Sequence, residues 1–184
     1  MVLSRGGVRA CSESIKKLHR REGGVDELIE TARANLKDML GIIEQGKQGA
    51  TLASYLDTLY QELVEAITLR TILQGKDMQP PSRLDPPVPP VPFVQGICDA
   101  IGELRRACLD SVRMEQFEEA EHFFNLMERL HEHVNSLDYP NAMIPEVRHK
   151  SDVNRKLINA TRSDLTMVFQ MNKLTKNLSR LTKN

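Results

Sequence analysis

Apolar residues recur at three- and four-residue steps along almost the whole chain. One series begins after a Gly23-Gly24 break and consists of Leu28, Ile29, Ala32, Leu36, Met39, Leu40 and Ile43. Such steps place apolar side chains on one face of an α-helix, so the spacing predicts an amphipathic helix from Val25. A second series, Leu52, Leu56, Leu59, Leu63 and Ile67, predicts another helix that runs to about Gln74 and ends at Gly75.

The same period predicts further helices over residues 4–21, 93–112 and 115–137, and a long one from about Glu146 into the C-terminal tail. No unit of about 20 to 50 residues repeats along the chain. The chain has 184 residues, which suits one domain with a substantial core. We therefore predict an all-α bundle of about six helices in a single domain, residues 1–184.

Residues 75–92, GKDMQPPSRLDPPVPPVP, contain seven of the nine prolines. Proline lacks a backbone donor and fixes φ, so this segment is predicted to be an extended connector that is neither helix nor central strand. At the other end of the chain, residues 166–184 form a basic tail that the apolar period predicts to be helical.

The formal net charge is zero, but the charges are unevenly distributed. Residues 110–146 hold nine acids and two bases, whereas residues 148–184 hold nine bases and two acids. Three cysteines without Cys-x-x-Cys spacing argue against a disulfide framework or zinc site and indicate a reducing, cytoplasmic location. No apolar run approaches the roughly 20 residues that span a bilayer, so we expect no membrane association.

Two pairs of acids carry the candidate chemistry. Glu62 and Glu65 lie about 60° apart on the predicted helix beside its apolar stripe, and Asp99 and Glu103 lie one turn apart on the next helix. If the two helices face each other, the four carboxylates could bind Mg²⁺ or Mn²⁺. Acid pairs at this spacing also occur on solvated helix faces, and spacing alone does not decide between the two interpretations.

Two Glu-x-x-His elements, Glu119 to His122 and Glu128 to His131, match the ligand pattern of di-iron bundles. Those proteins carry the elements on two helices, whereas here one predicted helix carries both, so a solvated surface is the better interpretation. The sequence contains no P-loop, nucleophile elbow or Gly-x-Gly-x-x-Gly motif.

Three segments resemble the signature segments of the translin and translin-associated factor X family. They are QELVEA at 61–66, FVQGICDAIGELRRACLDSV at 93–112 and, as the loosest match, LSRGGVRACSESIKKLHR at 3–20. Residues 138–165 resemble the closing helix of archaeal members. The resemblance implies an all-α bundle of about seven helices whose subunits assemble into a hollow, octamer-like shell that encloses RNA.

The X-type members of this family are Mg²⁺-dependent endoribonucleases, whereas translin-type members bind nucleic acid and lack the full acidic set. The X-type acidic motifs match Glu62, Glu65, Asp99 and Glu103, so the resemblance implies that these residues hold Mg²⁺ or Mn²⁺ and carry catalysis. It also implies that the two helices are neighbours. The expected reaction is hydrolysis of single-stranded or small structured RNA by a metal-activated water.

The expected partners are RNA, further copies of the same chain in a homo-octamer, and a second translin-like subunit. Candidate RNA-binding residues are Arg70, Arg105, Arg148, Lys150 and Arg155, which belong in part to a basic run that also includes His149, Lys156 and Arg162. An alternative for this run is a basic face that pairs with the acidic fifth helix. Two other functions stay open, a non-catalytic translin-like binder of RNA or single-stranded DNA and a structural adaptor.

Overall fold

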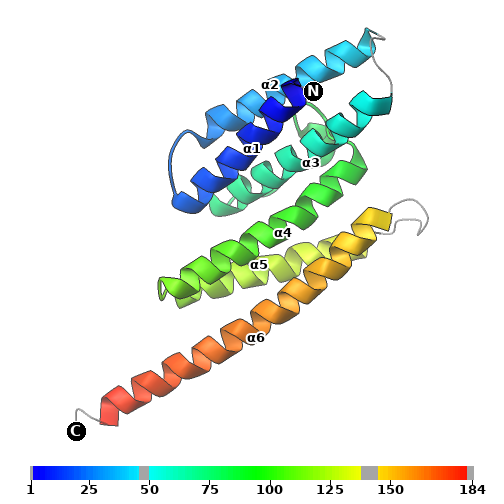
Figure 1. The fold of residues 1–184 in the computed structure, drawn as a ribbon. Coiled ribbons are helices and arrows are strands. Elements are labelled where there is room, and N and C mark those ends of the chain that lie inside the picture. The colour runs from blue at the N-terminus through cyan, green and yellow to red at the C-terminus, as the bar shows by residue number, and fades with distance from the viewer. Residues whose placement is uncertain (1, 46–49, 138–144, 182–184) are drawn as a thin grey trace. The chain divides into compact units, whose positions relative to one another are not determined.

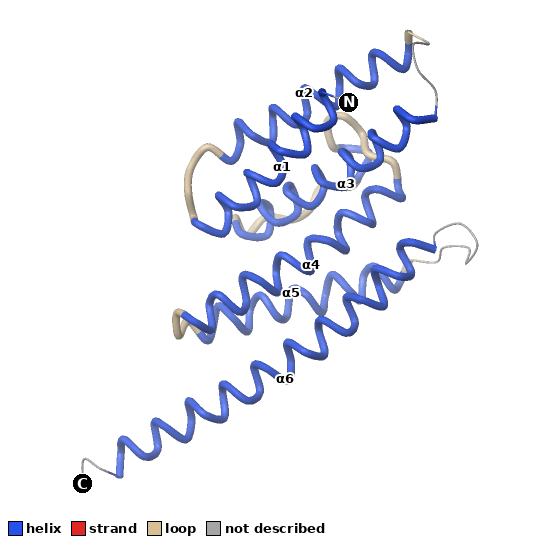
Figure 2. Tube along the Cα trace, viewed as in Figure 1, coloured by secondary structure: helices blue, strands red, loops and turns tan. Residues whose placement is uncertain are grey.

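A computed structural model describes residues 2–45, 50–137 and 145–181, and these residues are almost entirely helical (Figures 1 and 2). The α-helices are α1 (Val2–Arg20), α2 (Val25–Glu44), α3 (Ala50–Leu73), α4 (Pro90–Arg113), α5 (Phe117–Ser136) and α6 (Pro145–Leu181). A short 3₁₀ helix, η1, spans Pro81–Arg83. Within the described ranges there is no strand, which confirms the predicted all-α class. None of these helices is long and apolar enough to cross a membrane.

The described helices belong to two compact units, and the boundary between them falls within α4 and within the first turn of α6. The first unit comprises residues 1–100 and 139–148, and the second comprises residues 101–138 and 149–184. Residues 138–144, the first part of the segment that resembles the closing helix of archaeal family members, lie outside the described residues.

The first unit is built on α1, α2 and α3, which all pack against one another. The predicted stripe of α2 is buried at Ile29, Ala32, Leu36 and Met39, and each of these side chains is at most 1% exposed. Gly24 precedes this helix with φ of 80°, a left-handed conformation that glycine adopts without steric cost. The predicted Gly23-Gly24 break is therefore confirmed.

Two glycines bring helices of the first unit into close contact. A Cβ atom on Gly7 of α1 would lie 2.6 Å from Leu59 Cδ1 of α3. A Cβ atom on Gly96 of α4 would lie 2.5 Å from the backbone oxygen of Gln61 and 2.7 Å from Val64 Cβ. Only glycine permits contacts this close. Through them α1 and the first turns of α4 pack directly against α3.

The proline-rich connector departs from its prediction at both ends of its proline run. Pro81 begins η1, and Pro90 and Pro92 lie in the first turn of α4, so part of residues 75–92 is helical. The first turn of a helix tolerates proline because its N–H groups have no intrahelical partner. Elsewhere the connector packs on the first unit: Leu84 and Val88 are buried. Lys37 Nζ of α2 donates a 2.7 Å hydrogen bond to Asp85 Oδ2.

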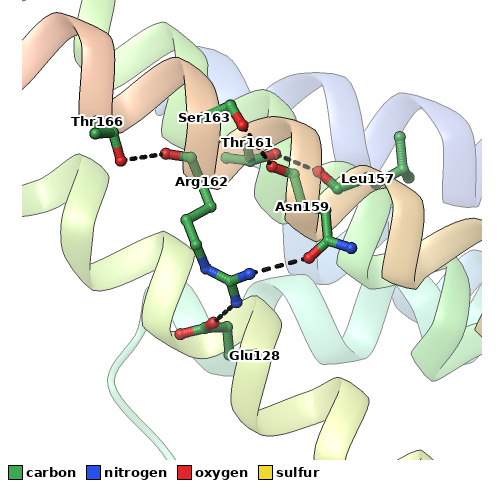
Figure 3. A network of polar contacts seen from close by, with 7 residues as sticks. All are labelled: Glu128, Leu157, Asn159, Thr161, Arg162, Ser163 and Thr166. Carbon is green, nitrogen blue, oxygen red and sulfur yellow. Dashed lines mark hydrogen bonds and ion pairs between the residues drawn. The ribbon is translucent and has the colours of Figure 1, made fainter.

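The second unit contains the later turns of α4, all of α5, and α6 from residue 149 onward. Its buried side chains include Phe123 and Met127 of α5 and Ile158 and Leu165 of α6. Arg162 of α6 contacts α5 in two ways: its guanidinium forms an ion pair with Glu128 and lies 5.6 Å from the centre of the Phe124 ring. Figure 3 shows this guanidinium between Glu128 and Asn159.

Candidate functional site

The acidic pair of α3 lies at the edge of the buried face of this helix. Leu59, Leu63 and Ile67 are buried, as the apolar series predicts, whereas Glu62 and Glu65 are half-buried. Neither residue is a fully exposed surface group, because each is itself half-buried.

The negative charges of the acidic pair affect the pKa of a cysteine on α1. Cys11 is completely buried, and its pKa is raised to about 12, first by burial and then by the negative charges of Glu62 and Glu65. A charge shifts the pKa of another group measurably only when the two are near each other, so both carboxylates lie on the side of α3 that is close to α1. The thiol stays protonated at neutral pH and is not a nucleophile.

A hydrogen bond joins the two acidic helices. Gln61 Nε2 of α3 donates to Asp99 Oδ2 of α4 at 2.6 Å, in a partly buried position. Together with the contact at Gly96, this bond places the first part of α4 beside α3, as the resemblance implied. Asp99 therefore lies next to the residue that precedes Glu62.

Glu103 lies one turn after Asp99 on α4 and belongs to the second unit. Its side chain is 25% exposed and is 3.9 Å from Arg106 Nη1, one turn further along the helix. Glu62, Glu65 and Asp99 all belong to the first unit.

Carboxylate oxygens are the donors that Mg²⁺ and Mn²⁺ prefer, so the chemistry of these four side chains fits a hard divalent cation. Among the described residues, however, no three His, Cys, Asp or Glu side chains are grouped closely enough to hold an ion. The four-carboxylate ligand set stays a prediction.

The histidines of α5 make contacts within that helix. His133 Nδ1 is 2.6 Å from the Arg129 carbonyl oxygen, and His131 Nε2 is 3.0 Å from Asn135 Nδ2. Both Glu-x-x-His elements lie on α5, so the two-helix arrangement of a di-iron site does not arise from them.

Most candidate RNA-binding arginines have acidic neighbours. Arg70 forms an ion pair with Asp26 of α2, and Arg155 pairs with Asp152 at 2.8 Å on its own helix. Arg105 donates to Thr161 at 3.0 Å and is 3.4 Å from Asp164, and both partners lie on α6.

The remaining cations of the basic run divide into two groups. Arg148, His149 and Lys156 are exposed and Lys150 is half-buried, all on the first part of α6. Arg162 pairs with Glu128 of α5, so the alternative of pairing with the acidic helix holds at this residue (Figure 3).

Two residues near the acids were not predicted from the sequence to belong to the site. Gln61 stands in the QELVEA segment and Cys11 in the segment 3–20, but a lone amide or thiol on a helix gives no sequence signal of its partner. The hydrogen bond to Asp99 and the packing of α1 identify them.

These features define an all-α protein with partly buried carboxylates on two adjacent helices. The sequence matches the Translin family over residues 9–159, and the chain belongs to this family. An uncharacterized protein of Methanocaldococcus jannaschii, MJ0175, is 31% identical over 186 residues, which cover 97% of this chain and 79% of that protein.

Solved structures agree with this assignment. The crystal structure of AfC3PO is similar with a TM-score of 0.79 and 26% identity, and the match covers 92% of this chain and 87% of that chain. The structure of an AfC3PO complex with duplex RNA has a TM-score of 0.79 and 25% identity, and that match covers 92% and 86%. Apo-NeC3PO has a TM-score of 0.77 at 18% identity, with 90% and 86% coverage, and supports the fold alone.

Proposed function

We propose that the chain is an X-type member of the Translin family, a divalent-metal-dependent endoribonuclease that binds and cleaves single-stranded or small structured RNA inside an oligomer. The observation that carries this proposal is the hydrogen bond from Gln61 to Asp99. It joins the two helices whose acids match the X-type motifs, so that Glu62, Glu65 and Asp99 belong to one packed unit.

The catalytic residues in this proposal are Glu62, Glu65, Asp99 and Glu103. Mg²⁺ or Mn²⁺ bound by their carboxylates would supply a Lewis acid and an activated water for phosphodiester hydrolysis. Gln61 holds one oxygen of Asp99 in place through its amide. The apolar face of α3 fixes the backbone that carries Glu62 and Glu65, because Leu63 and Val64 are buried beside them.

The proposal that this chain binds RNA is supported by the AfC3PO complex with duplex RNA, a protein 25% identical to it. We assign backbone contacts to Arg148, Lys150 and Arg155 of α6, with Arg105 and Arg70 as further contacts. Arg155, Arg105 and Arg70 would exchange an acidic neighbour for a phosphate, which lowers the net gain from each contact.

Self-assembly is supported by an apolar stripe on the C-terminal half of α6. Met167, Met171, Leu174 and Leu178 follow steps of four, three and four residues and are 54 to 67% exposed. Large apolar side chains exposed in a row indicate a protein interface. We propose a homo-oligomer of about eight copies, with a second translin-like subunit as a possible partner. We place it in the cytoplasm, because Cys11, Cys98 and Cys108 are free thiols.

A second candidate function is a non-catalytic RNA-binding oligomer of the translin type. The observation that favours it is that no three potential ligands within the described ranges are grouped to hold a metal ion. The two functions differ only in the fate of bound RNA.

The deciding experiment incubates a labelled single-stranded RNA with the protein in Mg²⁺, in Mn²⁺ and in excess chelator. Cleavage that requires the metal supports the ribonuclease, provided that Asp99→Asn abolishes it and the exposed α3 control Asp57→Asn does not. Binding without cleavage under every metal condition would leave the translin-type binder as the function.

A further inference from the structure

The second unit has a hollow between the first turn of α5 and the last turns of α6. Its volume is about 420 Å³. From α5 it is lined by Phe117, Glu118 and Glu121, and from α6 by Phe169, Asn172, Lys173, Lys176, Asn177 and Arg180. We call this the α5–α6 hollow, and none of its residues belongs to the acidic site described above.

The cationic side of the hollow is one stripe of α6. Phe169, Lys173, Lys176 and Arg180 follow steps of four, three and four residues, so all four lie on one face. With a rise of about 1.5 Å per residue, Lys173 and Arg180 are separated by about 10 Å along the axis. This length exceeds the spacing of about 3.4 Å between charges along one strand of a duplex, so the stripe can follow more than one phosphate.

This stripe lies opposite the apolar stripe of the same helix. At about 100° per residue, the mean direction of Met171, Leu174 and Leu178 is roughly 160° from that of Lys173, Lys176 and Arg180. The two faces of the C-terminal half of α6 are therefore available to different partners, a protein surface on one side and a charged ligand on the other.

The cations of the hollow form no ion pair within the described part of the chain, although Glu118 and Glu121 line its other side. No ion pair there involves Lys173, Lys176 or Arg180. Residues 166–181 contain no acid at all. Arg105 and Arg162, further back on the second unit, do have carboxylate partners. An anionic ligand at the stripe displaces no internal ion pair, whereas one at Arg105 or Arg162 must.

Two aromatic rings adjoin the cations. Phe117 and Phe169 contact each other edge to face, with ring centres 5.9 Å apart and planes at 89°, and both side chains are half-buried. Both rings line the hollow. An aromatic surface next to cations is the combination that binds single-stranded nucleic acid, with bases against the rings and phosphates against the charges.

We propose that the α5–α6 hollow binds a segment of single-stranded RNA. Lys173, Lys176 and Arg180 bind its phosphates, and a base lies against Phe169. Glu118 and Glu121 repel phosphate on the α5 side and so confine the backbone to the α6 side. This inference rests on the RNA-binding part of the proposed function and adds a surface that is made of other residues than the four acids.

The first test measures binding of a short single-stranded oligoribonucleotide by fluorescence anisotropy, in chelator so that cleavage does not interfere, at several salt concentrations. The triple variant Lys173→Gln, Lys176→Gln, Arg180→Gln should weaken binding about 10-fold or more and reduce the salt slope by about 2, the loss expected for three phosphate contacts on a single strand. The matched control removes three exposed cations of the first unit, Lys16, Lys76 and Arg83, and should change affinity less than about 2-fold.

Two further variants give readouts that leave the three cations of the hollow in place. The chain contains no Trp, so Phe169→Trp introduces a single fluorophore at the hollow, and RNA should quench or shift its emission. Replacing Glu118 and Glu121 together by Gln should raise RNA affinity, because two repulsive charges are removed.

The site is refuted if the triple variant binds RNA like its matched control, or if Trp emission at position 169 is unchanged at saturating RNA. A loss of assembly in light scattering, without a change in RNA affinity, would identify the stripe as a subunit contact and also overturn the proposal. Failure of the wild-type protein to bind RNA at all would instead refute the RNA-binding part of the proposed function. Circular dichroism at 222 nm confirms that each variant keeps its helices.

Discussion

Gly96 is the position at which a single methyl group should separate the two acidic helices. Because Gly96 has no side chain, α4 lies very close to α3. A Cβ atom added to Gly96 would be 2.5 Å from the Gln61 carbonyl oxygen and 2.7 Å from Val64 Cβ. Both distances are shorter than any ordinary contact, and the first is to backbone, which cannot rotate away. We predict that Gly96→Ala pushes α4 outward and lengthens the hydrogen bond between Gln61 and Asp99.

The expected cost follows from two opposing contributions. Alanine stabilises a helix interior by about 1 kcal/mol relative to glycine, whereas overpacking of a close contact costs about 1 to 3 kcal/mol and sometimes more. With both van der Waals contacts far below the usual limit, the clash should dominate, for a net loss of about 2 kcal/mol. For a chain of this size that corresponds to a melting temperature lower by about 4 to 8 °C.

Gly102 provides the matched control on the same helix. A Cβ atom there would have no neighbour within 4 Å, so Gly102→Ala should keep only the helix-propensity gain and raise the melting temperature by about 1 to 4 °C. Gly41 of α2, also with open space around it, is a second control. Thermal unfolding followed at 222 nm, at one protein concentration for all variants, measures the three effects.

The reasoning fails if Gly96→Ala melts at or above the wild-type temperature, or if it is indistinguishable from Gly102→Ala. A stable Gly96→Ala protein would mean that α4 does not depend on close contact with α3. In that case the proximity of Asp99 to Gln61 would not be a fixed property of the fold.

Three further predictions concern the metal, the assembly and pH. Asp99→Asn should lower RNA cleavage by about 100-fold or more while RNA affinity in chelator is kept or rises slightly, and wild-type activity in this variant or in excess chelator would exclude the carboxylate site. Replacing Met171 and Leu178 by Gln should reduce the assembled mass in light scattering, and an unchanged mass would exclude the apolar stripe as an interface. Burial, and then the charge of Arg155, lower the pKa of His131 from its ordinary 6.5, so the folded state favours the neutral ring. The stability that this residue contributes is therefore present above about pH 6.5 and is lost as the pH falls through the lowered pKa. The melting temperature of the wild-type protein should fall more between pH 7 and pH 5 than that of His131→Gln. Equal pH profiles of the two proteins would contradict this prediction.

The helices themselves could be predicted from the sequence because their signal is local. The apolar series around Leu28 and Leu36 depends only on the 3.6-residue period, and Gly24 ends the preceding turn by its own backbone freedom. The ends of the proline-rich connector were harder to predict from the sequence, because proline is excluded from helix interiors but is accepted in the first turn of a helix. Only the position at which the helix begins decides between these cases, and the buried Val88 and Val94 lie on either side of that position.

The relations between helices were decided by the tertiary structure. Four acids in two motifs are visible in the sequence, but the bond from Gln61 to Asp99 joins residues 38 positions apart, and no local period encodes it. No local period encodes the position of Cys11 either. This residue is buried close enough to Glu62 and Glu65 for their charges to raise the pKa of its thiol.

The cations of α6 show most directly what the sequence determines and what the tertiary structure determines. Arg162 and Lys173 have the same formal charge and the same helix, yet Arg162 meets Glu128 of α5, whereas Lys173 faces the α5–α6 hollow. Composition determines how many charges the chain carries. Which of them are neutralised depends on the crossing of α5 and α6, because an ion pair requires two atoms within a few ångströms and that distance is set by packing alone.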